Sequence, residues 1–168
     1  LDFAFQNNLR LERDRFLISY YFLLRFSDVQ AVRPENFIRA EGKDYFRYTS
    51  QKTGIECTLP VGSAARAILE RYHYAFPASS NQDANRKLKT IAAAAGITGR
   101  APSGKWKWEE VTTHTARRSA ATNLYLAGAG IKLIAQLGGW VKLDTLRRYL
   151  LASGIDAAKV AGELDFFR

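Results

Sequence analysis

One segment of the sequence carries an imidazole and a guanidinium three residues apart, at His114 and Arg117. Positions i and i+3 of a helix share a face, so the two side chains would point the same way. Thr113 can cap such a helix, and the free N–H groups at a helix start favour an anion. The pair therefore predicts a phosphate site, although two such residues more often lie on a solvated helix face.

A tryptophan and a tyrosine nine residues apart form the second candidate group. Trp140 follows two glycines, and Tyr149 lies in the segment Leu146-Arg147-Arg148-Tyr149-Leu150. The structural alternative is a buried Trp140 anchor and a half-buried helical Tyr149 with its hydroxyl in water. Because the chain has eight tyrosines, singling out Tyr149 needs more than its presence.

Two further cationic residues, Arg25 and Lys52, lie at positions that restrict the orientation of their side chains. Arg25 ends an apolar run, and its guanidinium must reach water or find an acceptor, since burying an unpaired charge is costly. Asp28, three residues on, can orient it. Lys52 lies in Gln51-Lys52-Thr53-Gly54, where the glycine favours a tight turn. Lys52 is therefore expected at the tip of a hairpin.

The elements that must position these residues follow from periodicity and turn chemistry. Leu9 to Phe26 predicts a largely buried helix. Residues 27–30 have the form of a capping box that starts a short helix, which Pro34 stops. Extended segments are expected at 36–39, 45–50 and 55–60, with Cys57 on the apolar side. Helices are expected at 63–75, 81–95, 113–127, 131–137, 142–151 and 156–167, with a loop at 96–110. The fold class is therefore mainly α with a small three-stranded antiparallel sheet.

The bulk composition indicates a basic globular domain. Lys and Arg number 25 against 16 Asp and Glu, a net charge of +9, so polyanions such as nucleic acid or an anionic membrane are attracted. The apolar run Phe16 to Leu24 is far shorter than a membrane span needs. A single cysteine suits a reducing compartment. Since the chain lacks an initiator Met, we expect residues 1–168 to be a single domain of a longer protein, with a further domain upstream.

The order of these residues resembles the tyrosine recombinases, the phage-integrase family of Cre, lambda integrase and the Xer proteins. The family pattern is an Arg followed by an acidic residue, a hairpin Lys, His-x-x-Arg, a His or Trp, and a Tyr nine residues later. This chain has Arg25, Asp28, Lys52, His114, Arg117, Trp140 and Tyr149 in that order. It departs from the pattern at Leu23, where the family often has Gly, which we expect to concern packing more than chemistry. It also has Trp140, where bacterial integrases usually have His.

The resemblance implies the DNA breaking-rejoining fold and strand cleavage through a 3′-phosphotyrosyl intermediate, with no cofactor and no metal. It also implies that residues 1–168 are the catalytic domain and that the upstream domain clamps DNA. Arg25 and Arg117 would clamp the non-bridging oxygens of the phosphate, and Trp140 would add a neutral donor. Lys52 would protonate the leaving 5′ oxygen. His114 would assist proton transfer at the nucleophile.

That nucleophile would be Tyr149, and Asp28 would orient the first arginine. The implied partners are double-stranded DNA and further protomers, as a tetramer on DNA and a monomer when free, in the cytoplasm and not at a membrane. An apolar stripe at Val160, Leu164 and Phe167 would either dock on a neighbouring protomer or pack on its own domain. The candidate DNA contacts are Lys105, Lys107, Arg118, Arg147 and Arg148.

Four other functions are alternatives to this interpretation. A type IB topoisomerase or a telomere resolvase would use the same chemistry with another outcome. A basic helical DNA-binding module would need all six site residues to be coincidental. A metal-dependent nuclease would need a cluster of acidic ligands, and the sequence shows no convincing one.

Overall fold

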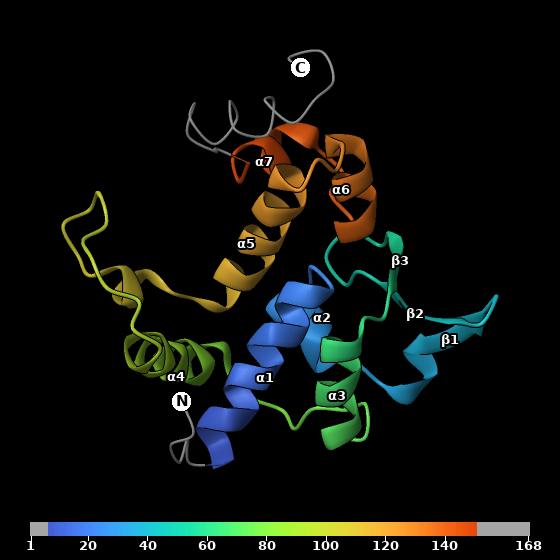
Figure 1. Ribbon diagram of the computed structural model, residues 1–168, viewed down its shortest axis with the longest axis horizontal. Helices are drawn as coiled ribbons and strands as arrows, with labels where there is room; N and C mark the ends of the chain where they lie inside the picture. Colours follow the sequence, from blue (N-terminus) through green and yellow to red (C-terminus); the bar gives the residue numbers. More distant parts are fainter. Residues whose placement is uncertain (1–6, 151–168) are drawn as a thin grey trace.

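The computed structural model describes residues 7–150, with side chains from residue 9 onward. Within this range the chain is mainly helical, with one small sheet (Figure 1), as predicted. The elements in chain order are α1 (Asn7–Tyr21), α2 (Phe26–Gln30), the short 3₁₀ helix η1 (Pro34–Asn36), β1 (Phe37–Ala40), β2 (Lys43–Thr49), β3 (Glu56–Pro60), α3 (Ser63–Arg71), α4 (Asn81–Ala94), η2 (Lys107–Glu110), α5 (Thr113–Leu126), α6 (Ile131–Gly138) and α7 (Leu143–Arg147).

The sheet is antiparallel in the order β1-β2-β3. Phe46 and Tyr48 alternate with exposed residues along β2 and pair with Leu59 and Cys57 of β3. These four side chains are buried, and the Phe46 ring stacks on Phe22 with centroids 4.6 Å apart. One face of the sheet therefore forms part of the core, and the prediction that Cys57 lies on that face is confirmed.

Helix α1 is the central helix, in contact with α3, α4 and α5 (Figure 1). Its buried side chains include charged ones, which are paired within the protein. Arg15 Nη1 lies 2.6 Å from Glu12 Oε2, and Asp14 Oδ2 accepts hydrogen bonds from Arg71 (2.6 Å) and Tyr72 (2.9 Å). Burying these charges is tolerated because each has a partner. The Asp14 contacts tie α1 to the end of α3.

The predicted course of the chain after α1 is wrong in detail. Helix α1 ends at Tyr21 instead of Phe26, because Leu23 has φ 51° and breaks the helical path. Helix α2 begins at Phe26 with Arg25 at its N-cap position and no side-chain cap, so the capping box at residues 27–30 does not form. Its Gln30 side chain instead accepts the backbone N–H of Ser79 (2.8 Å).

Three later helices also differ from expectation. Helix α3 ends at Arg71 instead of Ala75, because His73 and Tyr74 both have positive φ. The N-cap of α5 is Thr112, whose backbone is extended and whose N–H donates to Thr115 Oγ1 at 3.0 Å. Thr113 is the first helical residue and donates its N–H to Asn85 and its hydroxyl to Asn81 on α4.

Helix α7 is short and ends at Arg147, so Tyr149 lies beyond it instead of within a helix spanning 142–151. The helix expected at 156–167 and its apolar stripe lie outside the described residues. Among residues 7–150, no helix is both long and apolar enough to cross a bilayer.

Candidate active site

A single pocket gathers the six residues that the sequence singled out for chemistry. They arrive from separate places: the α1–α2 connection, the β2–β3 hairpin, the start and first turn of α5, the α6–α7 connection, and the turn after α7. The residues lining the pocket are Arg25, Lys52, Thr53, His114, Arg117, Trp140, Val141, Lys142, Thr145 and Tyr149.

Arg117 lies at the base of this pocket and is 1% exposed. Its guanidinium donates hydrogen bonds to the carbonyl oxygens of Leu23 and Gly138, the latter at 2.7 Å. The same group stacks on the Trp140 ring, 3.6 Å from its centroid. Burial, followed by the nearby charge of Arg25, lowers the pKa of Arg117 to about 10, so it remains a cation at neutral pH.

The left-handed backbone at Leu23 is what turns its carbonyl oxygen toward Arg117. Glycine adopts a positive φ freely, whereas leucine does so at a cost of about 1–2 kcal/mol. The expectation that Leu23 concerns packing is therefore incomplete, because the position sets a backbone conformation that supports an arginine of the pocket.

Arg25 is held by the hairpin that carries Lys52. Its Nη1 donates to Ser50 Oγ at 2.7 Å and lies 3.6 Å from Asp28 Oδ2. The other carboxylate oxygen of Asp28 accepts the backbone N–H of Gln51 at 3.0 Å. Asp28 thus links α2 to the hairpin and lies beside Arg25, the position expected of an orienting group. Ser50 was missed by sequence reasoning, and its only signal is a small polar residue directly before the hairpin turn.

His114 and Tyr149 form the polar contact at the other side of the pocket. His114 Nε2 and the Tyr149 hydroxyl oxygen are 3.0 Å apart. Desolvation, followed by the charges of Arg117, Arg118, Arg25 and Lys52, lowers the pKa of His114 below its usual 6.5. The imidazole is therefore neutral at neutral pH and can accept the phenol proton. The backbone of Tyr149 is held as well, since Thr122 Oγ1 donates to its carbonyl oxygen at 2.8 Å.

The two glycines before Trp140 are required by geometry. A Cβ on Gly138 would lie 1.9 Å from the Trp140 ring, and Gly139 has φ 65° and closes α6 as its C-cap. The Thr53 hydroxyl donates to the Gly139 carbonyl at 3.3 Å, which ties the hairpin to this corner. Trp140 is 7% exposed, so it is a buried anchor whose ring also supports Arg117.

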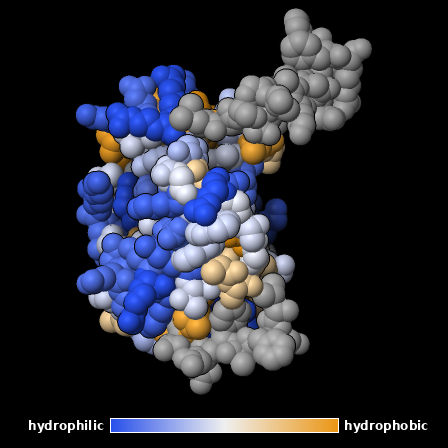
Figure 2. Space-filling view, turned by 90° about the vertical axis from the view of Figure 1, so that its left-hand side faces the viewer, coloured by the Kyte–Doolittle hydropathy of each residue, from blue (hydrophilic) through white to orange (hydrophobic). Residues whose placement is uncertain are grey.

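The candidate DNA contacts lie outside the pocket. Lys105 and Lys107 are exposed in the segment between α4 and α5. This segment projects away from the helices, on the left of Figure 1. Figure 2 shows that the face seen from this side is mostly hydrophilic. Within this segment the Arg100 guanidinium stacks 3.9 Å from the Trp106 ring centroid.

The remaining candidates flank the tyrosine. Arg118 and Arg148 are exposed, with the Arg118 guanidinium 5.8 Å from the Tyr149 ring centroid. Arg147 is also exposed and pairs with Asp144 at 3.0 Å.

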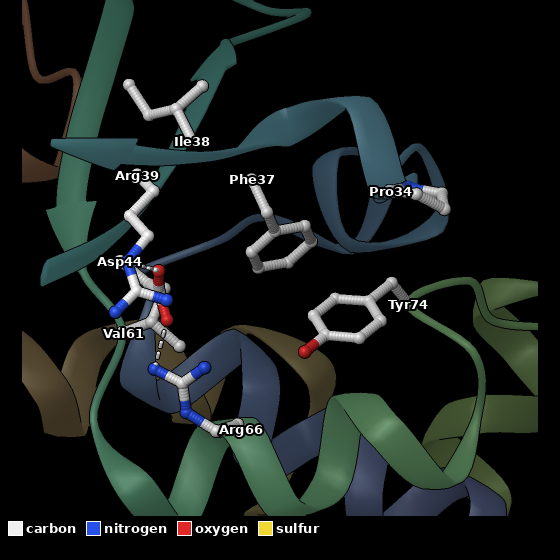
Figure 3. Close-up of a pocket in the computed structure, with 8 residues that line it drawn as sticks. All are labelled: Pro34, Phe37, Ile38, Arg39, Asp44, Val61, Arg66 and Tyr74. Atoms are coloured by element: carbon white, nitrogen blue, oxygen red, sulfur yellow. Dashed lines mark ion pairs between the residues drawn. The ribbon is translucent and has the colours of Figure 1, made fainter. Parts of the chain in front are cut away.

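A different pocket, where β1 and β2 face α3, carries none of this chemistry (Figure 3). The Phe37 and Tyr74 rings meet there edge to face, and Asp44 pairs with Arg66 at 2.5 Å. Its charged side chains, Arg39, Asp44 and Arg66, are paired with each other, and its lining includes no histidine. Within residues 7–150, no group of three His, Cys, Asp or Glu side chains is placed to hold a metal ion.

The comparisons with known proteins agree on one class. The family model described as the phage integrase family matches residues 6–153. The tyrosine recombinase XerC of Syntrophus aciditrophicus (strain SB) is 26% identical over 156 residues, covering 84% of this chain and 49% of the relative. The chain therefore spans about half the length of that relative.

Solved structures show the same fold at low sequence identity. A post-cleavage complex of the XerH site-specific recombinase with palindromic difH substrate has a TM-score of 0.72 at 14% identity, covering 97% of this chain and 48% of that one. XerA recombinase has a TM-score of 0.68 at 14% identity, with 92% and 62% covered. The catalytic domain of bacteriophage HP1 integrase has a TM-score of 0.55 at 14% identity, with 100% and 99% covered.

The fold is that of the catalytic domains of tyrosine recombinases, and the predicted fold class is confirmed. The chain belongs to the phage integrase family.

Proposed function

We propose that this protein cuts and rejoins DNA strands site-specifically, with Tyr149 as the nucleophile, without a metal or cofactor. The observation that carries the proposal is the His114–Tyr149 contact of 3.0 Å at the edge of a pocket lined by Arg25, Lys52 and Arg117. Membership of the phage integrase family favours recombination over a type IB topoisomerase, a telomere resolvase or a non-catalytic module.

The first step forms one bond and breaks another at the same phosphorus atom. The Tyr149 hydroxyl gives its proton to His114 Nε2, and its oxygen attacks the scissile phosphate. Lys52 gives a proton to the leaving 5′ oxygen as the P–O5′ bond breaks. The products are a 3′-phosphotyrosyl linkage and a free 5′-hydroxyl. Because a phosphodiester-type bond is retained, a second 5′-hydroxyl can reverse the reaction without an external energy source.

The cations stabilise the negative charge that develops on the phosphate. Arg117 reaches it from the buried base of the pocket, and Arg25 from the hairpin side, where Ser50 and Asp28 orient it. Arginine suits this role because its planar guanidinium binds two oxygens at once. The Trp140 ring stacks on the Arg117 guanidinium and so supports it. The indole N–H of Trp140 serves as a neutral donor to the phosphate.

The acting assembly is proposed to contain DNA and several copies of the protein. Relatives of this fold are solved with DNA, among them XerH with difH substrate and the Tn1549 transposon integrase with circular intermediate DNA. We propose a tetramer on DNA in the cytoplasm and a monomer when free. Sedimentation with and without residues 155–168, on and off DNA, tests whether that segment holds protomers together. Equal self-association of the protein with and without residues 155–168 would contradict a role of this segment in joining protomers.

A covalent adduct tests the nucleophile without knowledge of the DNA site. The protein is incubated in EDTA with a library of nicked duplexes of randomised sequence, and detergent-resistant protein–DNA adducts are captured and sequenced. We expect adducts that share a sequence and that disappear in Tyr149→Phe. Tyr125→Phe is the matched control, because Tyr125 is an exposed tyrosine of α5 outside the pocket.

Two outcomes would contradict the proposal. An adduct that persists in Tyr149→Phe would assign the nucleophile elsewhere. A wild-type protein that binds the library but forms no adduct from any sequence in it would remove the cleavage activity.

A further inference from the structure

One lysine of the active-site pocket has no part in the chemistry described above. Lys142 lies two residues after Trp140, directly before α7, and lines the pocket together with the six candidate residues. It is exposed, as is the neighbouring Val141 at 66%. By contrast, Arg117 is 1% exposed. Lys142 therefore belongs to the rim of the pocket, whereas Arg117 forms its base.

The charge around Lys142 is unbalanced. The pocket is lined by Arg25, Lys52, Arg117 and Lys142 and by no carboxylate. Asp144, the nearest acid along the chain, pairs with Arg147 at 3.0 Å. Among residues 7–150, no carboxylate makes an ion pair with Lys142. Lysines gathered without acids repel one another, and such a cluster favours a polyanion that supplies several negative charges at once.

The position of Lys142 points to a phosphate other than the one that is cut. Arg25, Arg117, His114 and the Tyr149 hydroxyl line the same pocket, so the scissile phosphate belongs between the two arginines and the tyrosine. A DNA strand carries one phosphate per roughly 3.4 Å of helix axis. A strand whose scissile phosphate enters the pocket therefore brings its adjacent phosphates to the rim.

We infer that Lys142 binds a backbone phosphate next to the scissile one and so fixes the register of the cleaved strand in the pocket. This inference rests on the proposed function and extends it to a residue outside the six. Lys142 acts through binding, whereas Lys52 acts on the leaving oxygen. The two lysines of one pocket therefore have separate roles that kinetics can distinguish.

The first test compares Lys142→Ala with Lys132→Ala, an exposed lysine on α6 that does not line the pocket. Binding is measured on a fluorescent 30-base-pair duplex over a range of salt concentrations, and cleavage on a sequence recovered from the nicked library. For Lys142→Ala we expect the slope of log K against log salt to fall by about 0.9, and KM to rise about tenfold. The cleavage rate at saturation should stay within about twofold, as for a binding contact.

The second test replaces the leaving 5′ oxygen by sulfur, which departs without a proton. This substrate should restore cleavage by Lys52→Ala but leave the weakened binding of Lys142→Ala unchanged. A salt slope and KM equal to those of Lys132→Ala would overturn the inference, as would a slow Lys142→Ala variant that the sulfur substrate rescues. Either result, with normal adducts in the wild type, leaves the proposed function standing. Absence of wild-type adducts would remove both.

Discussion

The two arginines of the pocket are positioned mainly by neutral oxygens. Arg117 donates to two backbone carbonyls, and Arg25 donates to the Ser50 hydroxyl at 2.7 Å while its ion-pair distance to Asp28 is 3.6 Å. A neutral acceptor orients a guanidinium without cancelling its charge. The charge of Arg117 is therefore not cancelled by an acid in direct contact, and that of Arg25 is offset only by Asp28 at 3.6 Å, so positive charge remains available to a phosphate in a partly desolvated pocket.

Replacing Ser50 by Ala tests this positioning role. The change removes one hydrogen bond to a charged group, so we expect the rate of adduct formation at saturating DNA to fall by about tenfold. KM should change little, because the charge of Arg25 remains. Single-turnover kinetics measure both, with the exposed Ser63→Ala as control. A rise in KM at an unchanged rate would indicate a binding role for Ser50.

The lowered pKa of His114 predicts the pH dependence of cleavage. The imidazole must be neutral to accept the Tyr149 proton, so cleavage should decline in acid as pH falls through a midpoint below 6.5. His114→Ala should lose this acid limb together with about 100-fold of the rate. Single-turnover rates between about pH 5 and 8 measure the effect. The only other histidine, His73, provides the control His73→Asn, which should retain the wild-type profile. An acid limb centred above 6.5 would contradict the assignment.

At the scale of single residues, part of the site can be predicted from the sequence alone. The six pocket residues were predictable because their chemical types and their order along the chain match the pattern of the tyrosine recombinases. Ser50 and Thr122 were not, because a serine before a turn and a threonine on a helix have many uses. Their roles depend on contacts with Arg25 and Tyr149 that exist only after folding.

At the scale of elements, the ends of two helices supply the backbone carbonyls that hold Arg117 at the base of the pocket. The first lies just after α1, where the Leu23 carbonyl accepts a hydrogen bond from Arg117, and the second is at the last residue of α6, Gly138, whose carbonyl does the same. Sequence pattern predicted the sheet and most helices to within a few residues. It missed the end of α1 because leucine is a strong helix former, and its left-handed conformation is imposed by tertiary contacts.

Gly138→Ala tests the role of the end of α6. Its Cβ would overlap the Trp140 ring, so Trp140 must shift and Arg117 loses its stacking surface. We expect a loss of stability of about 1–3 kcal/mol, typical of an overpacked site, together with loss of adduct formation. Thermal denaturation and the adduct assay measure the two effects. Gly130→Ala is the control, since a Cβ there meets nothing within 4 Å. Wild-type behaviour of Gly138→Ala would show that the indole position is unimportant.

At the scale of the whole molecule, the net charge of +9 predicts strongly salt-dependent binding to DNA. We propose that the exposed segment bearing Lys105 and Lys107 contributes two of these phosphate contacts. Replacing both lysines by Ala should reduce the slope of log K against log salt by about 1.8. Lys43→Ala is a single-charge control, because Lys43 lies at the β1–β2 turn, on the opposite side of Figure 1. An unchanged slope in the double variant would exclude this segment from the interface.

The two hydrogen bonds between Tyr149 and α5 predict that a molecule uses its own tyrosine, as the proposed nucleophile, and not that of a neighbour. Both its hydroxyl and its carbonyl oxygen are bonded to the helix that also carries Arg117, in one and the same chain. Each protomer therefore carries a complete set of reactive groups. A mixture of Tyr149→Phe and Arg117→Ala proteins should fail to complement, because neither can lend its intact group to the other. Adducts formed by the mixture would show instead that tyrosines are exchanged between neighbours.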